Sequence, residues 1–172
     1  MAILNLIEFT LLPVVLLWLG ICVWHDLKNR EVPVLLTVVP LASACLVGVL
    51  FGRWAAACLV AVLILLSDLA THRTSWGILA AALIALSDPT SGMLIISIVV
   101  VWMLWDFGAM GGADAKILIS LLLLWGSGLV LVPVALAGGF QGLMAWWRKK
   151  REIPYTVAIL LGSAGYWLAK LI

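Results

Sequence analysis

The sequence predicts an all-α membrane protein, a polytopic bundle of six to eight transmembrane helices formed by a single domain, residues 1–172. Hydrophobic residues make up 66% of the chain and charged residues only 10%, whereas soluble domains are about 25% charged. The charged residues gather in short segments between long apolar runs. These segments are too short to form a separate soluble module.

Eight apolar runs are the candidates for these helices, because about 20 apolar residues cross about 30 Å of hydrocarbon. The first run is too long for the apolar part of a cleaved signal peptide and lacks a basic segment before it, which indicates a retained helix. The fourth and fifth runs are short, so they form either two short helices or one re-entrant hairpin. The runs cover residues 3–24, 34–51, 54–70, 76–86, 93–105, 115–125, 129–147 and 153–168.

The basic residues predict the orientation in the membrane, since Lys and Arg of short loops accumulate on the cytoplasmic side. With six or eight crossings, only Arg53 and Lys170 fall on the outer side. Both termini are therefore expected outside a cell membrane, with the site described next facing the cytoplasm. The residues expected on the cytoplasmic side are Lys28, Arg30, His72, Arg73, Lys116 and the cluster Arg148, Lys149, Lys150 and Arg151.

Two carboxylates, Asp26 and Asp114, stand at predicted cytoplasmic helix ends. A charge at the bilayer centre costs roughly 2.5 to 3.5 kcal/mol, so an acid near membrane depth needs a polar cavity or a partner. Two carboxylates about 3 Å apart share one proton, so that one activates a water while the other protonates a carbonyl oxygen. The residue types alone leave proteolysis, ion conduction and a structural role open.

Small residues surround the second aspartate in GAMGGADA, residues 108–115. Gly111 and Gly112 permit close backbone approach and dihedral angles forbidden to larger residues. They predict a site built around a main-chain substrate.

Three stretches resemble motifs of the type IV prepilin and preflagellin peptidases. HDLKNREVP (residues 25–33) resembles the first aspartate motif, in which Asp is followed by a basic pair and then by Ile or Val before Pro. MGGADAK (110–116) resembles the G-x-G-D motif with its following Lys, and Ala113 stands where the family has glycine. IPYTVAILLG (153–162) resembles the start of the last helix of the family. The matches occur in the family order and extend over most of the chain.

The resemblance implies an intramembrane-type aspartyl endopeptidase that removes the short basic leader of pilin-like or archaellin-like precursors. Its implied partners are that precursor and membrane lipid, without nucleic acid, and it implies no metal and no organic cofactor. The chain resembles the short, peptidase-only form, because it lacks the cysteine-paired domain of the large enzymes. The implied catalytic pair is Asp26 and Asp114, the motif backbone is Gly111, Gly112 and Ala113, and the substrate-contacting or charge-tuning residues are Lys28, Arg30 and Lys116.

Two other functions compete with proteolysis. A small proton- or ion-coupled transporter would use intramembrane acids, and Asp68 would then matter more than Asp26. A non-catalytic assembly subunit would retain the motifs without activity. Of the other acids, Asp88 is expected in a plain loop and Asp106 at a helix end near the interface. Most tryptophans, Trp18 and Trp125 among them, are expected as interfacial anchors.

Overall fold

The structure, a computed structural model, confirms the all-α prediction. It describes residues 2–69, 73–147 and 154–171, and none of these residues forms a β-strand. Most of them lie in eight α-helices, and two short 3-10 helices also occur, η1 (Pro89–Ser91) and η2 (Gly128–Val130). The helices are α1 (Ala2–Asn29), α2 (Val34–Leu50), α3 (Trp54–Leu69), α4 (Arg73–Ser87), α5 (Gly92–Asp106), α6 (Gly112–Trp125), α7 (Leu131–Trp147) and α8 (Tyr155–Leu171).

Within the described part of the chain, two helical segments have the length and composition of membrane spans, Thr10–Asn29 and Gly128–Trp147. Four further apolar helical segments are shorter, namely Val34–Leu50, Trp54–Leu66, Trp76–Ser87 and Gly92–Asp106. The fourth and fifth apolar runs form separate 15-residue helices, α4 and α5, joined by η1. At 1.5 Å per residue each is only about 22 Å long. The number of crossings, six or eight, stays a prediction.

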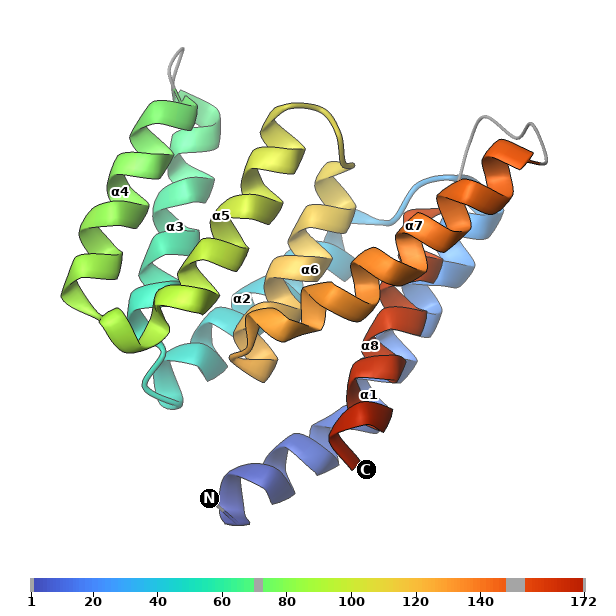
Figure 1. Cartoon of the computed structure of the whole chain (residues 1–172), viewed down its shortest axis with the longest axis horizontal. Coiled ribbons are helices and arrows are strands. Elements are labelled where there is room, and N and C mark those ends of the chain that lie inside the picture. Colours follow the sequence, from blue (N-terminus) through green and yellow to red (C-terminus); the bar gives the residue numbers. More distant parts are fainter. Residues whose placement is uncertain (1, 70–72, 148–153, 172) are drawn as a thin grey trace. The chain divides into compact units, whose positions relative to one another are not determined.

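The chain divides into two compact units. Unit 1 combines the two ends of the sequence, Met1–Leu36 and Leu129–Ile172, and unit 2 is the continuous segment Thr37–Gly128. In unit 1, α8 packs against both α1 and α7 (Figure 1). In unit 2, α5 packs against α3, α4 and α6 (Figure 1). The prediction of a single domain over residues 1–172 stays a prediction.

Helix α1 continues beyond its apolar run. The polar composition of residues 25–33 predicts a loop, but α1 ends only at Asn29. The helix continues because polar residues can keep the backbone hydrogen bonds of a helix although they end its apolar run. Lys28 in the last turn also favours the helix, since its positive charge lies at the negative end of the helix dipole. Arg30 then adopts a left-handed conformation with φ of 59°, a common way to stop a helix. Asp26 therefore lies inside the last turns of α1 rather than in a loop.

Helix α6 is the buried helix of unit 2, and Arg53 caps its C-terminal end. The Nη1 atom of Arg53 donates to the carbonyl oxygens of Leu123 and Leu124, both at 2.8 Å. Gly126 follows with φ of 61°, and a side chain there would overlap the guanidinium of Arg53. Arg53 thus satisfies carbonyls that a helix end leaves without intrahelical partners. It is a structural residue as well as an expected outer-side charge.

Two of the tryptophans expected as interfacial anchors interact with the protein itself, one through a hydrogen bond and the other through burial. Trp18 donates from Nε1 to the carbonyl oxygen of Leu36 at 2.8 Å. Trp125 is buried. Position near a helix end therefore does not by itself make a tryptophan an interfacial anchor.

Asp88 lies in the turn between α4 and η1, as expected of a loop residue, and its carboxylate orders that turn. The hydroxyl groups of Ser91 and Thr90 donate to its carboxylate at 2.6 and 2.5 Å. The Ser91 hydrogen bond, followed by that of Thr90, lowers the pKa of Asp88 below its usual value.

This shift predicts a pH-dependent contribution of Asp88 to stability. A carboxyl whose pKa is lower in the folded state stabilises the fold above the unfolded pKa of about 3.9, and the contribution is lost as the pH falls through the folded value. Asp88→Asn should therefore lower the melting temperature at pH 7 and have less effect near pH 3. Thermal unfolding of both proteins in neutral detergent measures the difference. A difference that is equal at both pH values would contradict the prediction.

Candidate active site

Asp26 is held by a hydrogen bond from the other end of the chain. Thr156, the second residue of α8, donates from Oγ1 to Oδ2 of Asp26 at 2.6 Å. Thr156 is only 2% exposed, while Asp26 is partly exposed. One carboxylate oxygen of Asp26 is thus fixed by a buried donor, and the carboxylate keeps access to its surroundings.

The start of α8, which carries Thr156, is positioned by α7. Gln141 of α7 donates from Nε2 to the carbonyl oxygen of Pro154 at 3.0 Å. A Cβ atom on Gly138 would lie 2.8 Å from Cε2 of Tyr155, so the absence of a side chain there admits the tyrosine ring. These contacts fix the backbone on both sides of the point where α8 begins. The donor to Asp26 is therefore supported by a second layer of contacts.

Asp114 lies in the first turn of α6, three residues after the N-cap residue Gly111. Because the N-terminal end of a helix carries a partial positive charge, it stabilises a negative side chain at this position. A Cβ atom on Gly111 would lie 3.1 Å from Oδ2 of Asp114, which is closer than ordinary contact. The glycine therefore leaves room for the carboxylate.

The motif glycines act through space rather than through unusual dihedral angles. Gly111 has φ of −66° and ψ of 145°, which any residue can adopt, and the glycine with positive φ in this stretch is Gly108. Gly112 is the first residue of α6, and a Cβ atom on it would lie 3.0 Å from Nε1 of Trp105. The expectation of dihedral angles forbidden to larger residues is wrong for Gly111.

Ala113, which replaces the glycine of the family motif, is the second residue of α6. Alanine has the highest helix propensity of all residues. Its helical position needs no glycine-specific conformation, so the departure from the family motif fits the local backbone.

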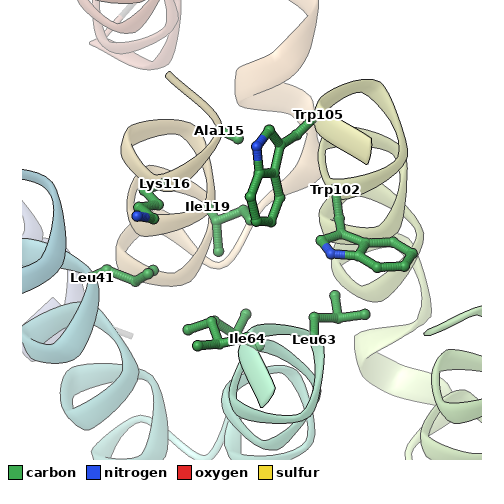
Figure 2. Close-up of a pocket in the computed structure, with 9 residues that line it drawn as sticks. Leu41, Leu63, Ile64, Trp102, Trp105, Ala115, Lys116 and Ile119 are labelled. Atoms are coloured by element: carbon green, nitrogen blue, oxygen red, sulfur yellow. The ribbon is translucent and has the colours of Figure 1, made fainter. Parts of the chain in front are cut away.

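The three basic residues of the predicted site have different surroundings. Lys28 is exposed, with Nζ 5.2 Å from the ring centroid of Trp24, and Arg30 is exposed at the end of α1. Lys116 lies on a different face of α6 from Asp114, since two residues correspond to a rotation of about 200°. It lines a cavity inside unit 2 together with Trp105 (Figure 2).

The structure joins the first and third motif stretches but describes Asp26 and Asp114 in different units. Asp26 belongs to unit 1 and Asp114 to unit 2. The catalytic pairing of the two carboxylates stays a prediction.

Of the other acids, Asp106 is the last residue of α5, which confirms its predicted position at a helix end. The side chain of Asp68 lies outside the described part of the chain, as do His72 and residues 148–151.

Thr156 is the polar residue that sequence reasoning did not assign to the site. It lies within IPYTVAILLG, the third stretch of the resemblance, but hydropathy gives a single threonine in an apolar helix no special role. Its distance from Asp26, 130 residues along the chain, hides the contact from any local pattern.

Comparisons of the chain with protein-family models, with curated proteins and with solved structures find no match.

Proposed function

We propose that this chain is a polytopic membrane aspartyl endopeptidase that removes the basic leader of pilin-like or archaellin-like precursors at the cytoplasmic membrane face. Large apolar side chains exposed on several helices support a membrane environment, among them Leu50 at 76% and Leu86 at 79% exposed. Soluble monomers rarely expose apolar surface in large continuous patches. The apolar composition supports the same environment.

The observation that carries the proposal is the hydrogen bond between Thr156 and Asp26. It connects two of the three stretches that resemble the peptidase motifs, although they lie 130 residues apart. The bond fixes the orientation of the Asp26 carboxylate through a buried donor from another helix. A catalytic carboxylate needs such support, because its orientation must be fixed relative to the scissile bond.

The surroundings of the two aspartates suggest separate roles. Asp114 lies at the positive end of the α6 dipole, which favours the carboxylate and suits the base that activates water. Asp26 then donates the proton to the carbonyl oxygen of the scissile bond, while Thr156 holds one of its oxygens in place. The two carboxylates and one water supply every proton transfer that peptide hydrolysis needs.

The substrate inserts its apolar helix beside the protein, with its basic leader in the cytoplasm. The residues proposed to contact the substrate or to tune the charge of the site are Lys28, Arg30 and Lys116.

The test is coexpression with a tagged pilin-like precursor that carries a basic leader, followed by mass spectrometry of the precursor. Loss of the leader with the wild type and its retention with Asp26→Asn or Asp114→Asn would support the proposal.

Thr156→Val should lower the cleavage rate roughly tenfold. The change keeps the shape of the side chain but removes the donor to Asp26, and a hydrogen bond between uncharged groups contributes about 0.5 to 1.5 kcal/mol, which corresponds to a factor of up to about ten. Thr156→Ser, which retains the hydroxyl, should restore most of the rate. Initial rates of precursor cleavage measure both variants. Equal rates for the valine and serine variants would contradict a positioning role for the hydroxyl.

A further inference from the structure

A cavity of about 250 Å³ lies inside unit 2, among α2, α3, α5 and α6 (Figure 2). Its walls are mainly aliphatic and include Leu41, Leu63, Ile64 and Ile119. It reaches the surface at α3, where Ile64 is 45% exposed. An engineered cavity of about 150 Å³ already holds benzene, so this one has room for part of an alkyl chain.

One residue of the cavity wall has a hydrogen-bond donor without a partner among the described residues. Trp102 is 1% exposed, and its Nε1 atom has no hydrogen-bond partner among the described residues. Figure 2 shows this nitrogen on the side of the indole that faces the cavity. A buried donor without an acceptor costs about 1 to 3 kcal/mol, so an acceptor from a ligand would remove a penalty that the fold carries.

The orientation of this donor is imposed by packing on the opposite edge of the ring. A Cβ atom on Gly77 would lie 2.5 Å from Cη2 and 2.6 Å from Cζ3 of Trp102. The six-membered ring therefore fits against α4 at a position where only glycine leaves room. With that edge fixed against Gly77, the five-membered ring and its N–H group are turned toward the cavity.

One cation completes the set of groups around the cavity. Lys116 is the single charged residue among the described residues that line it, and Figure 2 shows its side chain on the same side of the cavity as Leu41. A matching ligand must combine negative charge, acceptor oxygens and an apolar chain. An anionic glycerophospholipid has all three, in its phosphate, its ester carbonyl groups and its acyl chains.

We propose that this cavity binds an anionic phospholipid, with part of one acyl chain against the aliphatic walls, an ester carbonyl accepting from Trp102 and the headgroup at Lys116. Basic pockets between helices on the cytoplasmic side of membrane proteins are suited to acidic headgroups. The inference rests on unit 2 alone and holds whether or not the chain is a peptidase.

The test is native mass spectrometry of the purified full chain in neutral detergent with equal amounts of phosphatidylglycerol and phosphatidylcholine. The wild type should prefer phosphatidylglycerol about fivefold, the factor that corresponds to about 1 kcal/mol per basic residue near an anionic surface. Lys116→Gln should abolish this preference. Lys170→Gln, which removes an equal charge from an exposed position outside the cavity, should retain it.

Two further variants test the location. Trp102→Phe keeps the packing against Gly77 but removes the donor, and should weaken both lipids two- to tenfold. Ala115→Leu fills the cavity from its α6 wall and should prevent binding while the protein stays monodisperse. Equal binding of the two lipids to the wild type, an unchanged preference in Lys116→Gln, or undiminished binding by Ala115→Leu would each overturn the proposal. The last result would place the bound lipid outside the cavity.

Discussion

Asp26→Asn and Asp114→Asn should each reduce precursor cleavage by about 10²- to 10⁴-fold, the range that one general acid or base contributes to a reaction. Asparagine retains the size and the oxygen acceptor of the side chain but can neither accept nor release the catalytic proton. Thr156 can still donate to an amide oxygen at position 26, so Asp26→Asn should fold normally. The masses of precursor and product after coexpression measure the loss.

The double variant separates a catalytic pair from two independent acids. If the two carboxylates share one reaction step, changing both should cost little more than changing one. Asp88→Asn is the matched control, because it makes the same substitution in the turn between α4 and α5 and should leave cleavage unchanged. Normal processing by both single variants would end the peptidase proposal.

Gly162→Ala should destabilise the protein by about 3 kcal/mol, which lowers the melting temperature by about 6 to 12 °C. A Cβ atom on Gly162 of α8 would lie 2.6 Å from the backbone nitrogen of Val134 in α7 and would overlap its Cα. Backbone atoms of a helix cannot move aside as the end of a side chain can. The two helices must therefore separate to admit one methyl group.

Thermal unfolding in detergent measures this effect, and two variants show its cause. Gly165→Ala makes the same change on α8, where the nearest atom is 3.9 Å away, and should be neutral or slightly stabilising. Val134→Ala combined with Gly162→Ala should not restore stability, since the clash includes the backbone. A melting temperature of Gly162→Ala equal to that of the wild type would contradict the close approach of α7 and α8.

Hydropathy located eight apolar runs, and each of them forms the central part of one of the eight described helices. It predicted their ends less well, and α1 shows why. The rule counts apolar residues, whereas a helix ends where its backbone hydrogen bonds end, and polar residues such as Asp26 and Lys28 can continue them. The left-handed residue that stops α1 is Arg30, a type that gives no local signal for this conformation.

The contacts that define the site and the cavity were beyond a local reading of the sequence. Arg53 binds carbonyl groups about 70 residues away, and Thr156 binds Asp26 across 130 residues. Motif comparison found the aspartates and the stretch that contains Thr156, but only the packing of α8 against α1 assigns the threonine a partner. Trp102 is similar, because its orientation depends on Gly77 in a neighbouring helix.

The division of the chain has a consequence for its synthesis. Unit 2 is one continuous segment, so all of its helices are available as soon as Gly128 has left the ribosome. Unit 1 needs both ends of the sequence, and the 130 residues between Asp26 and Thr156 take roughly 7 to 26 s to translate at about 5 to 20 residues per second. During that interval Asp26 has no Thr156 hydroxyl to bind. A nascent chain that stalls before residue 156 would contain every helix of unit 2 while its first aspartate still lacked this donor.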